Sequence, residues 1–453
     1  MIMREEISVL LDRLMKKFRV PGAQLSLYHD GELHELALGV EESAAGRPVT
    51  PRSRFAFGSV SKIFTAALLM QLVEDGDIDL DAPIAEHLPP HDSSRHSVAS
   101  ATPRQLLSHT AGLRSDHEGG PLRSPSLRRY AASLLSLEHI NPPGTAFSYA
   151  NTGYALAAYL VEAVTAQDWW QTLESYLLLP NELDLAFVYD ARDPDARPDL
   201  VSGHTVDVRS GAVEPVEFYV EPPLVPAGGL AGSATDLVRF ACASMNRADA
   251  AAEIDIADID VLREMGRAVP VADPFGLADG WGAGWALHLA GDRFWYGHDG
   301  TLDGGTCNLR IDPEGATALA LTTNATTGVQ LWEELVAGLR DLEIDVGHYS
   351  QPTLRGEVAQ PSADITGRYV NGDLSVDITP QDQDSFRFTV ANGLSGQMRV
   401  TPELSFSVTV GDLGGMSFAG RFLVDPVDNK TVTAMQYNGR ALRRTGLAVR
   451  STA

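Results

Sequence analysis

Apolar residues recur with a helical period in residues 1–20 and are separated by charged residues. They are Ile7, Leu10, Leu11, Leu14 and Met15. This one-sided spacing predicts an amphipathic helix. It lacks the uninterrupted apolar core of a signal peptide, so we expect a mature N-terminal helix and a cytoplasmic location.

Farther along, alternating apolar and polar positions predict strand pairs near the start of the chain and again near residue 300. The runs are "AQLSLYH" and "ELHELALGV", then "FWYGH", "TCNLRID" and "ATALALTTNA". Helical patterns lie between the two groups, and another, "GVQLWEELVAGLRDL", follows the later one. Thr102 with Gln105, and Thr235 with Asp236, are typical of helix starts. Hairpins with segregated helices indicate an α+β domain over residues 1–350.

After residue 350 the helical pattern ends. Residues 351–362 are rich in Pro, Ser and Gly, and we interpret them as a linker. Roughly eight short alternating or β-branched runs then follow within residues 363–453, which is typical of a small antiparallel β-barrel. The sequence therefore predicts two domains, at 1–350 and 363–453.

The tripeptide His-Asp-Gly occurs twice, at residues 29–31 and 298–300. Asp-Gly is a common signal for a two-residue hairpin turn. The first copy joins two alternating runs and is interpreted as a turn. The role of the second copy depends on residues elsewhere in the chain.

Charge excludes several classes of partner. The 453-residue chain has 35 basic and 60 acidic residues, and its net charge of −25 opposes binding to nucleic acid or anionic membranes. No apolar run is long enough for a membrane-spanning helix. Cys242 and Cys307 match no metal-ligand spacing, so we predict neither a metal nor another cofactor. We expect a monomer.

The stretch "FAFGSVSKIFTAALLMQLVEDG", residues 55–76, places a serine and a lysine at the start of an apolar helical run. Ser59 and Lys62 are three residues apart and share one helix face. The helix dipole favours negative charge on the serine oxygen, and an apolar setting lowers a lysine pKa below its free value of about 10.4. Alone, the pair could equally be a capping serine beside a solvent-exposed lysine.

Two later segments supply polar partners. Tyr149 and Asn151 follow a Pro-Pro-Gly turn and precede a helix, where both could face a cleft; the simpler alternative is that Asn151 caps the helix. His298 lies on a predicted strand whose Gly300 would let another backbone approach closely. The three motifs in this order, Ser-x-x-Lys, Tyr-x-Asn and His-x-Gly, are far more specific than any one of them.

This order resembles the serine β-lactamase and penicillin-binding-protein superfamily, and more narrowly its class C β-lactamase, DD-peptidase and esterase branch. The segments "TPRQLLSHTAGL", "PPGTAFSYANTGY" and "PAGGLAGSATDLVRF" also match that branch. The resemblance implies a β-lactamase/transpeptidase-like domain, with an antiparallel sheet flanked by helices and an all-helical region. With a lipocalin-like barrel appended, the chain is similar to stand-alone penicillin-binding-protein-type thioesterases, which cyclise nonribosomal peptides and typically accept a D-residue at the acylating end.

The resemblance also implies a role for each motif residue. Ser59 would be the acylated nucleophile, and Lys62 would take its proton. Tyr149 would relay protons to the leaving group and later activate the acceptor. Asn151 would bond the substrate amide and Lys62, and His298 stands where most members carry lysine.

The backbone N–H groups of Ser59 and Thr301 would form the oxyanion hole. Further substrate contacts are expected from Gly300, Gly229, Leu230 and Arg440. In the related thioesterases an arginine of the barrel helps to bind the peptide. Arg440 is the candidate because the Asn438-Gly439 turn would present it at a rim, although it could equally be a surface residue.

The predicted activity is an acyl transfer. A peptidyl thioester, either free or on a carrier protein, would acylate Ser59, and the peptide's own amine would close the macrocycle at high effective molarity. A neutral or partly charged imidazole at His298 attracts a carboxylate less than an ammonium, which counts against β-lactamase activity as the native one. Two alternatives stay open: a cytosolic D-stereospecific peptidase, carboxylesterase or β-lactamase-like hydrolase, and a non-catalytic binding module.

Overall fold

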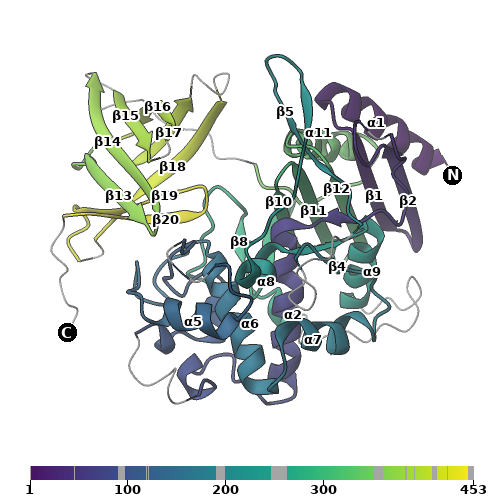
Figure 1. The fold of residues 1–453 in the computed structure, drawn as a ribbon. Coiled ribbons are helices and arrows are strands. Elements are labelled where there is room, and N and C mark those ends of the chain that lie inside the picture. The colour runs from purple at the N-terminus through teal and green to yellow at the C-terminus, as the bar shows by residue number, and fades with distance from the viewer. Residues whose placement is uncertain are drawn as a thin grey trace.

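A computed structural model shows two bodies, an α+β region and a barrel to one side of it (Figure 1). It describes residues 2–44, 46–89, 97–118, 120, 122–189, 199–245, 263–350, 361–382, 385–391, 393–410, 416–425 and 427–446. Nearly all of the predicted linker, residues 351–360, lies outside these ranges. Within them, no helix combines the length and apolar character needed to cross a membrane.

The α+β region is built on a seven-stranded antiparallel sheet with the order β2-β1-β12-β11-β10-β9-β8. The strands are β1 (Gly22–His29), β2 (Glu32–Gly39), β8 (Gly280–Trp281), β9 (Ala286–Ala290), β10 (Arg293–Leu302), β11 (Gly305–Asp312) and β12 (Thr317–Thr323). Ala23 of β1 lies opposite Thr323 of β12, so the first hairpin completes a sheet made by late strands. The five runs predicted as strands all fall on these elements.

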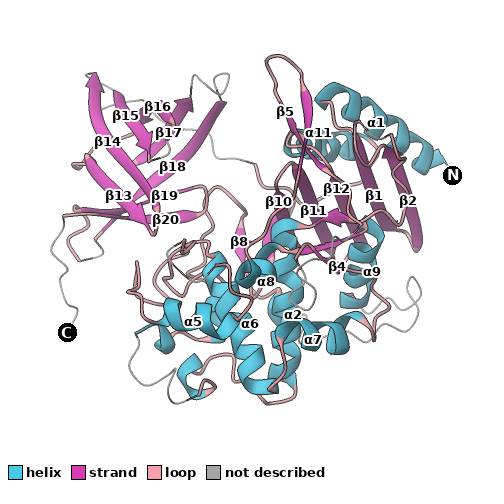
Figure 2. Cartoon of the chain, in the orientation of Figure 1, coloured by secondary structure: helices cyan, strands magenta, loops and turns pink. Residues whose placement is uncertain are grey.

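Helices cover both faces of this sheet. On one face, α1 (Ile2–Phe18) and α11 (Gly328–Asp341) pack side by side, and the five predicted apolar positions of α1 are buried. On the other face, α9 (Ala234–Ser244) contacts β1, β11 and β12. Figure 2 shows the strands of the sheet between these helices.

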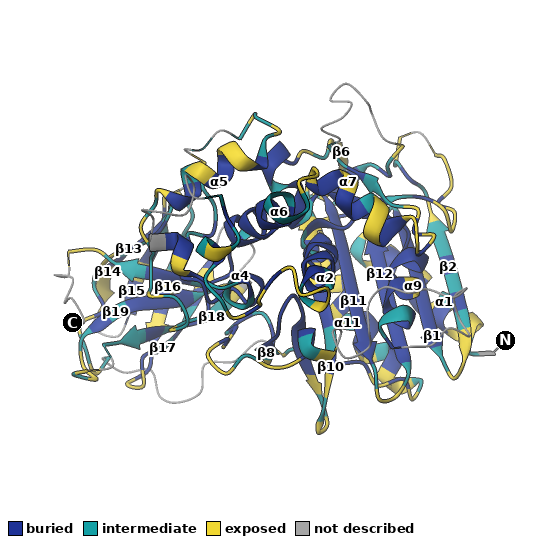
Figure 3. Cartoon of the chain, turned by 90° about the horizontal axis from the view of Figure 1, so that it is seen from below, coloured by how far each residue is buried: buried dark blue, intermediate teal, exposed yellow. Residues whose placement is uncertain are grey.

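The helical region lies below the sheet in Figure 1. Its longer helices are α2 (Ser61–Glu74), α5 (Leu127–Leu135) and α6 (Asn151–Thr165). Its shorter elements are η1 (Gly58–Val60), η2 (Ile84–Glu86), η3 (Ser97–Ser100), α4 (Pro103–Leu107), α7 (Trp169–Leu173), the π-helical η4 (Glu174–Leu178), η5 (Pro222–Leu224) and α8 (Val225–Gly228). Helix α2 is apolar on all sides and is therefore buried at the centre (Figure 3). Two small sheets, β3-β7-β4 and β5-β6, complete the α+β region, and β5 lies beside the main sheet at the top of Figure 1.

The small sheets consist of β3 (Phe55–Ala56), β4 (Ala186–Phe187), β5 (Gly203–Val206), β6 (Val213–Val216) and β7 (Leu230–Gly232). The helix starts agree only in part with the sequence. Thr102 and Gln105 form the predicted capping box of α4. The helix predicted to start at Thr235-Asp236 begins one residue earlier, at Ala234, because extended Ser233 caps α9 and its hydroxyl accepts from the Asp236 N–H at 3.1 Å.

The C-terminal body is a closed barrel of eight antiparallel strands, each paired with the next in sequence, and β13 paired with β20 closes it. The strands are β13 (Gly367–Asn371), β14 (Leu374–Asp382), β15 (Ser385–Val390), β16 (Ser395–Val400), β17 (Ser405–Val410), β18 (Met416–Val424), β19 (Val432–Tyr437) and β20 (Arg440–Arg444). Each of the short runs predicted after residue 363 is one of these strands. The predicted fold class, an α+β domain followed by a small antiparallel barrel, is confirmed.

Candidate active site

Ser59 and Lys62 meet at the start of the buried helix α2. Ser59 lies on the turn η1, and its Oγ is 3.2 Å from the Lys62 Nζ. Because α2 is surrounded by apolar side chains, Lys62 is 0% exposed, and the alternative of a solvent-exposed lysine is wrong. Burial lowers the pKa of Lys62 to about 7; the Asp116 carboxylate works against this fall, and Arg440 adds to it.

The partners of Lys62 define what its amine can do when neutral. Nζ is 2.7 Å from the Asn151 Oδ1 and 2.6 Å from the Ala227 carbonyl oxygen, and both of these atoms can only accept. A neutral amine has two N–H bonds and one lone pair. The two acceptors use the N–H bonds, so the lone pair is left for the third partner, the Ser59 hydroxyl.

Asn151 links Lys62 to a carboxylate. It is the first residue of α6, and while its Oδ1 accepts from Lys62, its Nδ2 donates to the Asp116 Oδ1 at 2.7 Å. The residue that caps α6 is Ala150, which makes no side-chain cap bond. The simpler interpretation of Asn151 as a helix cap is therefore wrong.

Tyr149 lies directly over this pair. The Lys62 Nζ is 4.9 Å from its ring centroid, and the ring packs on His109 at 4.2 Å between centroids. Burial raises the pKa of the Tyr149 hydroxyl well above its usual range, and the neighbouring Ser59 hydroxyl offsets this only in part. Because its pKa is raised, the hydroxyl is protonated at neutral pH and able to donate; the Ser59 hydroxyl lies near it, but no hydrogen bond of normal geometry joins it to another described residue.

His298 reaches the same site from β10. It is 2% exposed, and burial, with Lys62 nearby, lowers its pKa to about 3, so the ring is neutral at neutral pH. Its Nδ1 is 2.7 Å from the Asp299 carbonyl oxygen, which can only accept. Nδ1 therefore carries the proton, and Nε2 holds a lone pair that has no partner in the described part of the chain.

The other two residues of the second tripeptide, Asp299 and Gly300, hold β10 in place. The Asp299 carboxylate accepts two bonds from Arg310, at 2.7 and 2.9 Å, and one from Asn308 at 2.7 Å. A Cβ on Gly300 would lie 2.0 Å from the Phe57 carbonyl oxygen and 2.9 Å from the Ser59 nitrogen. Only glycine allows this approach, which bears out the expected close backbone contact.

This contact brings together the two backbones predicted to hold the oxyanion. A Cβ on Gly58, whose φ is +52°, would lie 2.7 Å from the Thr301 nitrogen. The N–H groups of Ser59 and Thr301 thus belong to adjoining segments. Their role as oxyanion donors stays a prediction.

Arg440 extends from the barrel to the site. It follows the predicted Asn438-Gly439 turn, in which both residues have positive φ. Its guanidinium carbon is 5.7 Å from the Tyr149 ring centroid, and its Nη2 is 4.0 Å from the Asp116 Oδ2. The barrel therefore touches the site, although a role for Arg440 in substrate binding stays a prediction.

Gly229 and Leu230 support the site through backbone hydrogen bonds. The Leu230 N–H donates to the Ser61 Oγ at 2.9 Å, and its carbonyl accepts from the Phe57 N–H at 2.8 Å. The Gly229 carbonyl accepts from the Val188 N–H at 2.8 Å. Leu230 is also 0% exposed, so the structure gives both residues a supporting position, and their predicted contact with substrate stays a prediction.

Sequence reasoning missed three residues of the site: Asp116, His109 and Trp281. Asp116 follows the matched segment "TPRQLLSHTAGL" in an irregular polar stretch, and that position is the one signal that points to it. Trp281 lies edge-on to His298 at 5.3 Å between ring centroids, and no local pattern connects the two. The described residues contain no cluster of His, Cys, Asp and Glu that could hold a metal ion.

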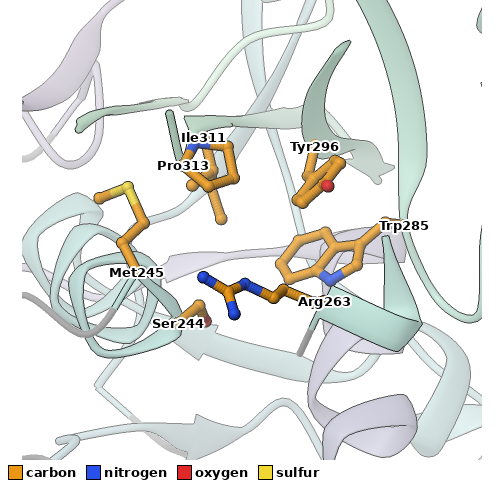
Figure 4. Close-up of a pocket in the computed structure, with 7 residues that line it drawn as sticks. All are labelled: Ser244, Met245, Arg263, Trp285, Tyr296, Ile311 and Pro313. Atoms are coloured by element: carbon orange, nitrogen blue, oxygen red, sulfur yellow. The ribbon is translucent and has the colours of Figure 1, made fainter. Parts of the chain in front are cut away.

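A separate cavity of about 80 Å³ lies at the end of α9 and beside β10 (Figure 4). Its lining residues are Ser244, Met245, Arg263, Trp285, Tyr296, Ile311 and Pro313. None of the five motif residues lines it. The chemistry described above is therefore independent of this cavity.

Comparison with known proteins agrees with this geometry. A family model described as beta-lactamase matches residues 8–341. Penicillin-binding protein 4 of Amycolatopsis lactamdurans is 31% identical over 369 residues, which cover 79% of this chain and 95% of that protein. Unguisins hydrolase ungD' of Aspergillus campestris is 23% identical over 360 residues, 76% of this chain and 66% of that protein.

Among solved structures, SurE is 42% identical with a TM-score of 0.87, and the match covers 97% of this chain and 98% of that one. A crystal structure of SurE with D-Leu matches with the same identity and a TM-score of 0.85, covering 97% and 99%. Because the match covers nearly the whole chain, it includes the barrel as well as the α+β region.

Proposed function

The chain belongs to the beta-lactamase family, and on this premise we propose that it is a serine acyltransferase that off-loads peptides from thioesters through an acyl-enzyme at Ser59. The observation that carries the proposal is the setting of Lys62. Its two N–H bonds are taken by Asn151 and Ala227, and its lone pair is left for the Ser59 hydroxyl. A lysine whose pKa is about 7 can hold this lone pair at neutral pH.

Acylation follows from these contacts. Lys62 takes the Ser59 proton as the Oγ–C bond forms, and the N–H groups of Ser59 and Thr301 stabilise the oxyanion. When the intermediate collapses, the C–S bond breaks and the thiolate takes a proton. Tyr149, whose raised pKa keeps its hydroxyl protonated, supplies that proton and recovers one from Lys62.

Release of the peptide reverses these roles. The peptide's own amine attacks the ester carbonyl and an N–C bond forms. Tyr149 takes the proton that the amine loses and passes its own proton to neutral Lys62, and Lys62 gives that proton to the Ser59 Oγ as the C–O bond breaks. The lone pair on the His298 Nε2 is a second acceptor through which the amine proton can enter this relay. A tethered amine held near the ester competes with water through its effective molarity.

The proposed substrate is a peptidyl thioester, either free or on a carrier protein, with a D-residue at the acylating end. Two observations support it. The similarity to SurE, a structure of which contains D-Leu, extends over the barrel. The neutral ring of His298 offers no fixed charge to a free carboxylate, which disfavours classical β-lactams. We propose that the enzyme works in the cytoplasm as a monomer.

The test is to mix the protein with a linear peptidyl thioester that ends in a D-residue and to identify the products by mass. We expect a macrocycle from the wild-type protein. We expect none from the Ser59→Ala variant, and none from the diastereomer that ends in the L-residue. If the linear acid is the only product at every pH and peptide length tried, the cyclase proposal is wrong.

A second candidate is a hydrolase for D-configured peptides, amides or esters. The similarity to a protein named unguisins hydrolase favours it. The two candidates share every step up to the acyl-enzyme and differ in whether water or an amine attacks it. Rapid turnover of D-amino-acid amides, without reaction of peptidyl thioesters, would favour the hydrolase. A fluorophosphonate probe that left Ser59 unlabelled would instead point to a non-catalytic binding module.

A further inference from the structure

The barrel holds one buried amide against the segment that carries Tyr149. Asn371, at the end of β13, is 1% exposed. Its Oδ1 accepts from the Ser115 N–H at 2.8 Å, and its Nδ2 donates to the Ala441 carbonyl at 2.8 Å and to the Ser148 Oγ at 3.2 Å. We propose that Asn371 is a positioning residue, through which the barrel fixes the location of Tyr149 in the active site. This inference rests on the proposed acyl-enzyme chemistry.

Ser115, which Asn371 contacts, is itself hydrogen-bonded to both residues of the Tyr-x-Asn motif. Its Oγ donates to the Tyr149 carbonyl oxygen at 2.7 Å. Its own carbonyl accepts from the Asn151 N–H at 2.8 Å. The backbone of residue 115 therefore lies between Asn371 on one side and the catalytic segment on the other.

The barrel also binds the same segment directly. The Tyr149 N–H donates to the Gly439 carbonyl at 2.9 Å, and the Ala441 N–H donates to the Ser148 Oγ at 3.2 Å. The Tyr149 N–H is thus bonded to the barrel, and the Tyr149 carbonyl is bonded to Ser115, which Asn371 holds. Tyr149 precedes α6, so its backbone is outside the hydrogen bonding of that helix.

This arrangement matters because no hydrogen bond of normal geometry holds the Tyr149 hydroxyl among the described residues, although the Ser59 hydroxyl lies near it. The location of the phenol therefore depends mainly on its ring contacts and on its backbone. A displacement of about 1 Å at a reacting group can cost about 10²-fold in rate. Asn371 is more than 200 residues from Tyr149 in sequence, yet it braces the backbone on which that location depends.

The experiment compares Asn371→Ala with a matched control, Gln436→Ala. Gln436 is also a buried amide of the barrel, 2% exposed, and its Nε2 donates across the same interface to the Asp273 carbonyl at 2.8 Å. It contacts neither Ser115 nor Ser148. With a simple activated ester as substrate, we expect Asn371→Ala to lower kcat about 10- to 100-fold with KM nearly unchanged, and Gln436→Ala to change kcat less than about 3-fold.

A double-mutant cycle separates positioning from general destabilisation. If Asn371 acts through the phenol, its effect on kcat should largely vanish in a Tyr149→Phe background, because the group it places is gone. An equal loss in both backgrounds, or an equal loss for Gln436→Ala, would overturn the proposal. Should Asn371→Ala fail to fold, Ser148→Ala removes the two bonds that the Asn371 Nδ2 and the Ala441 N–H donate to the Ser148 Oγ, and it should show the same dependence on Tyr149.

Labelling of Ser59 by a fluorophosphonate probe distinguishes this inference from the proposed function. If the wild-type protein labels and turns over the ester, and the cycle is additive, the acyl-enzyme chemistry stands and the positioning role is wrong. If the wild-type protein neither labels nor turns over, the proposed function itself fails, and the positioning role fails with it.

Discussion

The two His-Asp-Gly tripeptides are identical in sequence and opposite in environment. In the first, Asp30 and Gly31 have φ values of +52° and +80°, as a type I′ hairpin turn requires, and the Asp30 side chain is 85% exposed. In the second, the same three residue types continue a strand, and His298 is 2% exposed. The comparison shows that the partners that the fold brings to a motif decide what it does.

The two histidines should differ most in the effect of their substitution on activity. We expect His298→Ala to lower kcat of acyl transfer by about 10²- to 10⁴-fold, because it removes a buried proton acceptor beside Tyr149 and Lys62. His29→Ala loses the contact between Nδ1 and the Thr317 Oγ1 and a longer one between Nε2 and the exposed Asp30 carboxylate, and it should stay within about 2-fold of wild type. Steady-state kinetics on a thioester measure both, and equal losses would mean that the comparison is wrong.

Substitution of the two glycines should change different properties, the activity at Gly300 and the stability at Gly31. In Gly300→Ala the new Cβ would meet the Phe57 carbonyl at 2.0 Å, so η1 and the Ser59 N–H must move, and we expect kcat to fall about 10²- to 10³-fold. A Cβ on Gly31 would meet nothing within 4 Å. Gly31→Ala should therefore keep its activity and lose about 1 kcal/mol of unfolding free energy, since alanine disfavours positive φ. Activity and urea unfolding, measured on both variants, separate these effects.

The aspartates should differ in stability. Arg310 is 1% exposed and holds the Asp299 carboxylate with two bonds, so Asp299→Ala leaves a buried guanidinium partly unpaired. We expect a loss of about 1 to 3 kcal/mol in unfolding free energy. Asp30→Ala removes a mostly exposed carboxylate, and chemical denaturation should place it within about 0.5 kcal/mol of wild type. A loss of 1 kcal/mol or more at Asp30 would contradict this.

The smallest effect concerns pH. Acylation requires neutral Lys62, so kcat/KM should rise with pH through about 7, without a separate step from His298, whose pKa near 3 keeps it neutral. Asp116 raises the pKa of Lys62 and Arg440 lowers it. Asp116→Asn should therefore move the acidic limb to lower pH, and Arg440→Gln should move it to higher pH. If the acidic limb moved in the same direction in both variants, this assignment would be wrong.

Local patterns predicted much of this molecule. The eight barrel strands follow from two-residue alternation, and Ser59 with Lys62 follows from helical spacing, because each signal lies within a few residues. Asp116, Trp281 and Asn371 escaped notice because their partners are distant in sequence. Asn371 contacts Ser115 across 256 residues, and no periodicity records such a contact. The start of α9 was misplaced because Ser233 and Thr235 are both good capping residues, and backbone conformation decides between them.

The strand order bears on when this protein becomes active as it is made. Strand β1 is synthesised early but pairs with β12, so the sheet stays incomplete until the chain has passed Thr323. The barrel strands follow the sheet strands in the chain and pair mostly with their sequence neighbours, so they are synthesised after the sheet. Gly439, which accepts the Tyr149 N–H, is near the end of the described chain. We therefore expect a chain that is terminated before Gly439 to be inert, because the Tyr149 backbone would lack this hydrogen bond.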